Sequence, residues 1–301
     1  MAAPVPVRRR CGTMQVHHRL LESDPDFRAR QAELELRIHR RLAAEAPVRR
    51  AVTTVPTVVH VLYNTADEKI TATQVRSQVT ALNKDYRATN PDRANVPAVW
   101  QGLVTDVRVQ FALARKDPAG RNTNGILYVP TRQTSFGDDD AMKSRATGGS
   151  DPWPSDRYLN VWVCSLGGGL LGYAQFPGGP PKTDGIVVLN RAFGTRGTAT
   201  APFHLGRTST HEVGHWLNLR HVWGDTEDCS GTDFVADTPN AQHPNYGKPS
   251  FPHVSCQNGP NGDMFMNYMD YVDDDAMFMF TAQQVVRMQA TLDGPRSTIG
   301  T

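Results

Sequence analysis

The residues of this chain best suited to chemistry lie in the segment His-Glu-Val-Gly-His-Trp-Leu-Asn-Leu-Arg-His, which runs from His211 to His221. On a helix, His211 and His215 are one turn apart and point the same way. Glu212 lies beside them and is free to act as a base rather than as a ligand. Three imidazoles leave one position of a tetrahedral zinc ion open, which distinguishes a catalytic zinc site from a closed structural one. The segment therefore predicts a zinc-dependent hydrolase with three histidine ligands and Glu212 as general base.

The third histidine constrains the path of the chain. A continuous helix would carry His221 about 9 Å beyond His215, at ~1.5 Å per residue, which is too far for both rings to share one ion. The helix must therefore end between them. Asn218 is the expected end, because Asn tolerates the left-handed conformation that often terminates helices.

A second motif lies downstream, where Asn267-Tyr268-Met269-Asp270-Tyr271 places a methionine in a tight polar and aromatic context. A zinc motif with a third histidine, followed by a methionine turn, resembles the metzincin metalloproteases. Within them the chain is similar to the pappalysin family, specifically its small bacterial, ulilysin-like members. The residues that carry the resemblance are His211–His221, residues 262–271 and Met279-Phe280-Thr281. Asn218 departs from the general metzincin pattern, which has Gly at this position.

Residue periodicity predicts the elements that position these groups. The β-branched run at 55–63 predicts a strand, and Thr71 with Gln74 marks the start of a helix. Further strands are expected at about 107–114, 158–166 and 185–189, and a last helix near 283–292. With the resemblance, this order indicates an α/β (α+β) fold: a metzincin-type catalytic domain with a mixed twisted sheet, a backing helix, an active-site helix and a loop-rich C-terminal subdomain.

The N-terminal segment differs from the rest. Asp24-Pro25 is a helix start, and apolar residues then recur on one helical face until the break at Pro47. We expect a helical prosegment at 1–50 and a catalytic domain at 51–301. The upper part of that domain is expected at about 51–221 and the lower part at about 222–301, with the active-site cleft between them.

The resemblance also implies roles for two residues of the methionine turn. Pappalysins place a phenol two residues after the methionine, so Tyr271 is expected to approach the metal and the developing oxyanion. A packed core tyrosine is the alternative. Met269 is interpreted as a hydrophobic base beneath the imidazoles and not as a ligand.

Four cysteines have different contexts. Cys164 lies in a strand-like run and is expected to be a buried free thiol. Cys229 and Cys256 flank a Gly/Pro/Asp/Asn-rich segment in which a disulfide would close a long irregular loop. The resemblance implies this pairing, and hence an oxidising compartment. Cys11 precedes the prosegment helix, and a thiolate is a soft ligand that can take the open zinc position. The resemblance to the ulilysin prosegment favours a cysteine switch over an incidental thiol.

An acidic loop follows the zinc motif. Asp233, Asp237 and Thr238 crowd hard oxygen ligands together, and ulilysin-like enzymes carry calcium in this segment. We therefore expect a calcium ion held by Asp233 and Thr238 with help from Asp237. A merely solvated acidic loop is the alternative.

A second acidic run, Asp273 to Asp275, follows the methionine turn. A carboxylate at a pocket floor selects a cationic side chain by charge-assisted pairing. Asp274 occupies the position at which ulilysin-like proteases present the acidic residue that favours Arg or Lys immediately after the cut bond. A solvated edge or a set of calcium ligands is the alternative. With such a pocket, the enzyme would also cut its own linker, Pro47-Val48-Arg49-Arg50.

The whole chain gives few other signals. With 32 basic and 30 acidic residues, its net charge of +2 gives no reason to expect nucleic acid or membrane as a partner. No apolar run is long enough to span a bilayer, and no secretory signal is visible in this numbering, so an exported form would have had its signal trimmed.

We expect a secreted, bacterial, monomeric zinc endopeptidase that cuts peptides or proteins before Arg or Lys. It would be made as a zymogen, inhibited by its own prosegment and activated by autolysis. A gluzincin peptidase, whose third ligand would be a later Glu, is disfavoured by His221 and Met269. An inactive homologue or zinc-stabilised binding module is disfavoured by Glu212 and by the open coordination position.

Overall fold

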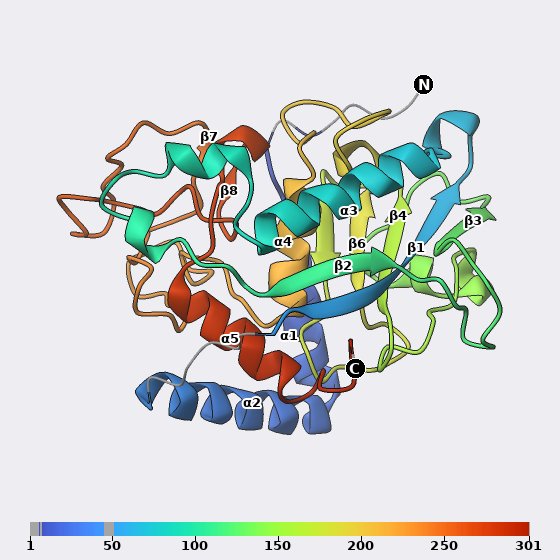
Figure 1. Cartoon of the computed structure of the whole chain (residues 1–301), viewed down its shortest axis with the longest axis horizontal. Helices are drawn as coiled ribbons and strands as arrows, with labels where there is room; N and C mark the ends of the chain where they lie inside the picture. The colour runs from blue at the N-terminus through green and yellow to red at the C-terminus, as the bar shows by residue number, and fades with distance from the viewer. Residues whose placement is uncertain (1–5, 7, 45–50, 301) are drawn as a thin grey trace.

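A mixed six-stranded sheet forms the centre of the molecule in the computed structural model, which describes residues 6, 8–44 and 51–300 (Figure 1). The strands lie in the order β2-β1-β4-β6-β5. Strand β3 pairs with the C-terminal part of β1, after the residues of β1 that pair with β2. Only β5 is antiparallel to its neighbour. The strands are β1 (Thr53–Tyr63), β2 (Val109–Leu113), β3 (Ile126–Pro130), β4 (Leu159–Cys164), β5 (Gly172–Ala174) and β6 (Ile186–Leu189). The predicted mixed sheet is confirmed, but β3 and the very short β5 were not predicted.

Two helices pack against the sheet and against each other: α3 (Ala72–Tyr86) and α4 (Arg207–Trp216). Alternate residues of β1 reach different cores, since Val59 and Val61 pack with α3 and α4 while Leu62 packs on the other face. A buried polar contact fixes α4 against α3, because Thr210 Oγ1 donates to Asp85 Oδ2 at 2.6 Å. The backing helix thus sets the position of the active-site helix.

The C-terminal part is rich in loops, as predicted. Its regular elements are the two-residue strands β7 (Tyr246–Gly247) and β8 (Tyr271–Val272), which pair in parallel, and α5 (Ala282–Leu292). Cys229 and Cys256 form the expected disulfide, which closes a loop with a sequence separation of 27 residues. Cys164 is a buried free thiol, also as expected.

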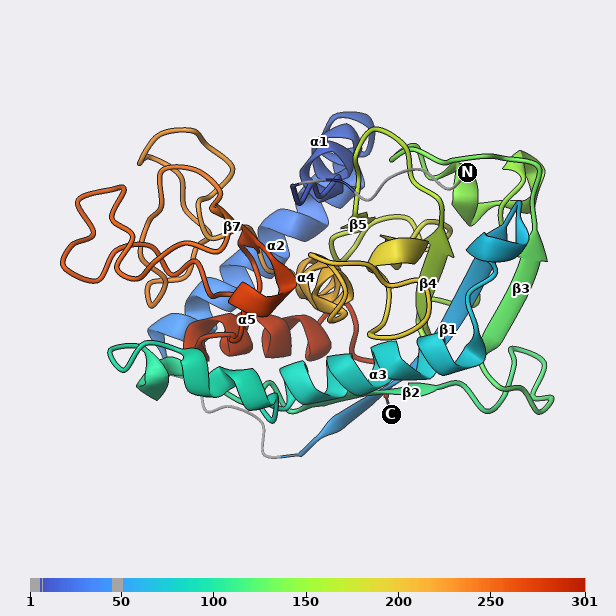
Figure 2. The same cartoon turned by 90° about the horizontal axis from the view of Figure 1, so that it is seen from above.

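Two helices precede the sheet, α1 (Thr13–Ser23) and α2 (Pro25–Ala43). The predicted start of α2 is confirmed, because the Asp24 side chain accepts from the Phe27 amide and Pro25 occupies the first turn. Helix α1 was missed, since its buried face mixes polar and apolar residues and gives no clear stripe. Figure 2 shows α1 and α3 on opposite sides of α4.

Helix α2 lies along α5 (Figure 1), where Leu34 and Ile38 pack against Ala290. An ion pair reinforces this contact: the Arg287 side chain, 1% exposed, donates to both Glu35 carboxylate oxygens at 2.8 and 3.0 Å. Asn218 Nδ2 also donates to Glu35 at 3.1 Å. Burial opposes ionisation of Glu35, but Arg287 and Asn218 outweigh it and lower its pKa. The N-terminal segment is therefore attached to the turn that follows α4.

Replacing Glu35 with Ala should loosen α2 from the body. The loss should be about 2 kcal/mol, below the ~3–5 kcal/mol of a fully buried pair, because the Glu35 side chain is 27% exposed. Hydrogen exchange of α2 in the intact protein measures this, with Glu33→Ala on the exposed face of the same helix as control. Unchanged exchange in Glu35→Ala would show that the ion pair does not hold the segment.

Candidate metal centre and active site

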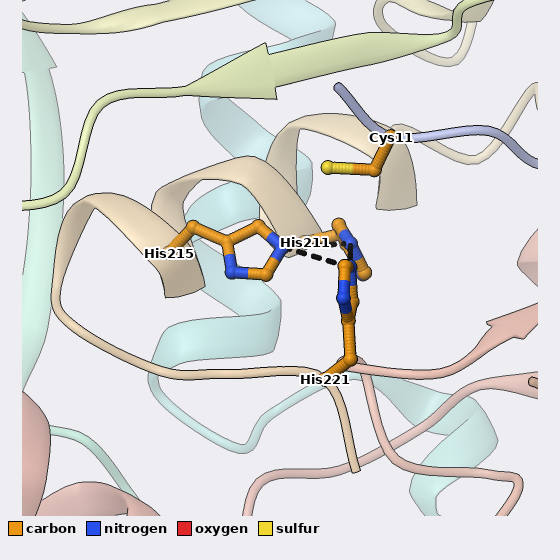
Figure 3. A group of neighbouring side chains, drawn as sticks. All are labelled: Cys11, His211, His215 and His221. Carbon is orange, nitrogen blue, oxygen red and sulfur yellow. Dashed lines mark hydrogen bonds between the residues drawn. The ribbon is translucent and has the colours of Figure 1, made fainter. Parts of the chain in front are cut away.

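The histidines predicted as ligands converge on one point (Figure 3). His211 and His215 come from α4, which ends at Trp216, and Asn218 then adopts a left-handed φ of 74°. This turn sends the chain back and delivers His221, as the spacing predicted. The three Nε2 atoms lie 3.1 to 3.2 Å apart, and all three rings are buried.

Backbone acceptors fix the orientation of the rings. His211 Nδ1 lies 2.8 Å from the Tyr268 carbonyl oxygen, and His215 Nδ1 lies 2.7 Å from that of Leu219. A carbonyl can only accept, so each Nδ1 carries the proton and each Nε2 presents a lone pair. His221 Nδ1 lies 2.5 Å from Asp225 Oδ1 and is oriented in the same way.

Three lone pairs that face one another cannot satisfy each other with hydrogen bonds. Burial also lowers the pKa of His211 and His215 well below the ordinary value, so these rings stay neutral. A cation between the three nitrogens satisfies all of them, and neutral imidazoles are preferred zinc ligands. The donor set therefore fits a zinc ion.

Cys11 approaches the same point from the N-terminal segment. Its Sγ and the ring nitrogens of the three histidines lie within 4.8 Å of one another. Residues 10–12 run parallel to the edge strand β5, since Leu171 N donates to the Arg10 carbonyl and Gly12 N to that of Gly172, each at 2.9 Å. The segment thus covers the histidines with an added strand.

Glu212 is engaged by the same segment. Thr13 Oγ1 and Cys11 Sγ lie 3.0 and 3.3 Å from Glu212 Oε2. Burial raises the pKa of Glu212 to about 8, against the lowering effect of these two donors. The carboxylate is beside the imidazoles, where a general base would stand, but the N-terminal segment separates it from solvent.

The methionine turn lies directly beneath α4. A Cβ at Gly214 would stand 2.4 Å from Met269 Sδ, so the helix needs glycine there to pack on the methionine. Tyr271 packs against the His221 ring at 5.0 Å, and its phenol oxygen accepts from the Cys11 amide at 3.2 Å. Trp223, which sequence reasoning missed, stacks on His221 at 4.3 Å and 11°.

Asp274 forms a buried ion pair with Arg9 of the N-terminal segment. Asp274 is fully buried, and its Oδ2 accepts from the backbone amides of Leu205 and Arg207 at 2.7 and 3.3 Å. Its Oδ1 accepts from Arg9 Nη2 at 2.7 Å. Arg9 also donates to the Val272 carbonyl oxygen and to Thr208 Oγ1. Sequence reasoning missed Arg9, although three arginines directly before Cys11 were a visible signal.

The predicted calcium ligands are only partly brought together. Thr238 Oγ1 donates to Asp233 Oδ2 at 2.7 Å, and burial raises the pKa of Asp233 to about 7. Asp237 points instead to α5, where its carboxylate accepts from Thr281 Oγ1 and from the Gln283 amide. Calcium at this loop stays a prediction.

This fold and this site define a metallopeptidase of the metzincin type, with two histidines and a glutamate on one helix, a third histidine after the turn that follows it, and a methionine turn beneath. The family model described as pregnancy-associated plasma protein-A, a peptidase family, matches residues 145–293. An extracellular metalloprotease of Arthroderma otae is 32% identical over 78% of this chain and 76% of its own length. The chain belongs to this pappalysin family of metalloproteases and hydrolyses peptide bonds, which removes the gluzincin and non-enzyme alternatives.

Solved structures give the same result. A promirolysin variant of Tannerella forsythia is 42% identical, with a TM-score of 0.89 and 97% of each chain covered. Mature mirolysin in complex with a cleaved peptide is 46% identical, with a TM-score of 0.82, and covers 84% of this chain and 97% of its own. In the described part of this chain, no helix is long and apolar enough to cross a membrane.

Asp225→Ala should weaken zinc binding about 10- to 100-fold, because His221 loses the acceptor that orients its ring. Asp225→Asn is the matched control, since Asn keeps an acceptor and tolerates the left-handed φ of 59° at this position. Competition against a chelator measures both dissociation constants. Equal affinities for the two variants would contradict an orienting role for this acceptor.

Proposed function

We propose that the chain is the zymogen of a secreted zinc endopeptidase that cuts before a basic residue, Arg above all. The observation that carries the proposal is the convergence of three imidazoles on one point, with Cys11 above them (Figure 3) and Glu212 within 3.3 Å of the Cys11 sulfur. Relatives named as extracellular metalloproteases support secretion. Peptides or proteins are the substrates, and the enzyme acts as a monomer.

His211, His215 and His221 would hold the zinc ion, which supplies a Lewis acid that polarises the scissile carbonyl and lowers the pKa of water. Glu212 takes a proton from the attacking water and returns it to the leaving amine. The Tyr271 phenol donates a hydrogen bond to the oxyanion that develops on the scissile carbonyl. Met269 supports the rings from below.

Glu212→Ala should retain zinc while kcat on prosegment-free protein falls at least about 100-fold, because general-base help is typically worth 10²–10⁴-fold. His221→Ala should lose both zinc and activity. Metal analysis together with peptide cleavage, with and without chelator, tests the assignment. Glu212→Ala turnover above about a hundredth of the wild-type value would exclude this residue as the essential base.

Latency is proposed to depend on Cys11, in a prosegment at 1–50 ahead of a catalytic body at 51–301. The Cys11 thiolate would be a zinc ligand in this form, and residues 10–12 would cover a cleft between the upper part of the body, about 51–221, and the lower part, about 222–301. The mature relative covers 84% of this chain and the proform 97%, as expected when such a segment is removed. The linker Pro47-Val48-Arg49-Arg50, where autolysis is proposed, lies outside the described residues.

Cys11→Ala should therefore mature faster than the wild type, because the ligand that closes the open metal position is gone. The new N-terminus should fall at Arg49 or Arg50. Timed N-terminal sequencing measures both. Cys164→Ala removes a buried thiol that is not part of the group around the histidines and should mature at the wild-type rate. Equal maturation rates for all three proteins would contradict the cysteine switch.

We propose that Asp274 determines the preference for a basic substrate residue. In this structure Arg9 is bound to Asp274. The guanidinium uses three nitrogens on three acceptors: Asp274 Oδ1, the Val272 carbonyl oxygen and Thr208 Oγ1. A lysine ammonium is a single point of donation and cannot reach all three. The pocket therefore supports a basic preference in which Arg exceeds Lys.

Asp274→Ala should lower kcat/KM for Arg peptides by about 10- to 150-fold, because hydrogen bonds to charged groups are worth ~1.5–3 kcal/mol. Peptides with an apolar residue in place of Arg should be affected less. Asp275→Asn is the control, since Asp275 is more exposed and pairs with Lys248. A cleavage profile of each variant measures the preference, and an unchanged Arg preference in Asp274→Ala would place the specificity elsewhere.

Calcium is proposed as a second cofactor at Asp233 and Thr238. Their close approach and the burial of Asp233 support it. In this arrangement Asp237 contributes to the cap of α5 instead of to the ion.

A further inference from the structure

Three consecutive arginines precede Cys11, and each docks in a different place. Arg9 enters the Asp274 pocket, and Arg10 donates to the Gly168 carbonyl oxygen at 2.6 Å. The Arg8 guanidinium lies over the aromatic ring of Tyr246, 5.1 Å from its centroid. Arg8 and Arg9 are consecutive in sequence, so two adjacent basic side chains contact Tyr246 and Asp274 respectively.

Backbone pairing places Tyr246 next to the acidic run that contains Asp274. Strand β7, which contains it, pairs in parallel with β8, so the Tyr246 and Tyr271 rings lie 6.0 Å apart. The carbonyl oxygen of the next residue, Gly247, accepts from the Asp273 amide at 2.9 Å and attaches β7 to the acidic run. Tyr246 is 39% exposed with Arg8 in place, so its ring remains accessible to a ligand from solvent.

The surroundings of Tyr246 favour a cation. Burial raises the pKa of its phenol, Arg8 lowers it, and the carboxylates of Asp270 and Glu227 raise it further. The face of an aromatic ring attracts a guanidinium or ammonium group within about 6 Å, and nearby carboxylates add to that attraction. Ring and carboxylates together are suited to a basic side chain.

We propose that Tyr246 forms a second cation-binding subsite next to the Asp274 pocket, so that the mature enzyme favours peptides with two adjacent basic residues. The proposal rests on the proposed function and names its substrate class more closely. Arg8 and Arg9 occupy both subsites in the latent form. A substrate chain that runs along β5 in the direction opposite to residues 10–12 would carry its second basic residue after the first in sequence instead of before it. Peptides with either order of the two residues must therefore be tested.

The test compares three peptides with the zinc-loaded enzyme freed of its prosegment. All share one Arg for the Asp274 pocket; one carries a second Arg before it, one carries it after, and one has Ala at both neighbours. In the wild type, one of the two diarginine peptides should exceed the single-arginine peptide about two- to five-fold in kcat/KM, the range expected for an exposed cation–π contact. Tyr246→Phe keeps the ring face and should keep this ratio, whereas Tyr246→Ala should reduce it to about one.

Phe251→Ala is a control for loss of an exposed ring, since Phe251 is 41% exposed and packs on Trp100 at 5.3 Å. It should keep the wild-type ratio. A ratio that persists in Tyr246→Ala, or a wild-type ratio of one in both orders, overturns the subsite while leaving the peptidase assignment intact.

A binding measurement separates failure of the subsite from failure of the proposed function. A labelled peptide with the sequence of residues 6–12, and its Arg8→Ala analogue, are titrated onto the same proteins by fluorescence anisotropy. The analogue should bind about two- to five-fold more weakly to the wild type and to Tyr246→Phe, and no more weakly to Tyr246→Ala. This result supports the subsite even if no peptide is cut; equal losses on all three proteins overturn it.

Discussion

The site depends on one constraint: each imidazole must donate its Nδ1 proton to a fixed acceptor so that three Nε2 lone pairs meet. The acceptors come from different segments. Tyr268 belongs to the methionine turn, Leu219 to the turn after α4, and Asp225 to the loop after His221. Because any shift of these segments would separate the nitrogens, much of the fold can be understood as support for this arrangement.

Arg207 shows how that support is shared. Its backbone amide donates to Asp274, and its side chain donates to the Tyr268 phenol and to Asp92. One residue at the start of α4 therefore joins the active-site helix, the methionine turn and Asp274. A buried cation with several acceptors is costly to disturb, so the three histidines and Asp274 are held in a fixed relation. The N-terminal segment contacts both, because Cys11 lies beside the histidines and Arg9 pairs with Asp274.

The sequence predicted the parts of the site that depend on local spacing. Two histidines one helical turn apart, a third that requires a chain reversal, and an Asn able to make it are properties of eleven consecutive residues. The sheet followed from β-branched runs, but β5 has three residues and is defined by its partners. Arg9 and Asp274 are 265 residues apart, so no periodicity relates them. Trp223 was missed for a different reason: it lies only two residues after His221, but its role comes from a ring stacking that no spacing motif indicates.

The central claim is that three imidazoles and the Cys11 thiolate converge on one zinc ion in the full chain. Zinc X-ray absorption of the zinc-loaded full-length protein tests it most directly. The account predicts a shell of three nitrogens and one sulfur, in which the sulfur is replaced by a light atom in Cys11→Ser while the zinc content is retained. A sulfur-free shell in the full-length protein, or zinc that stays bound after His211, His215 and His221 are all replaced by Ala, would contradict it.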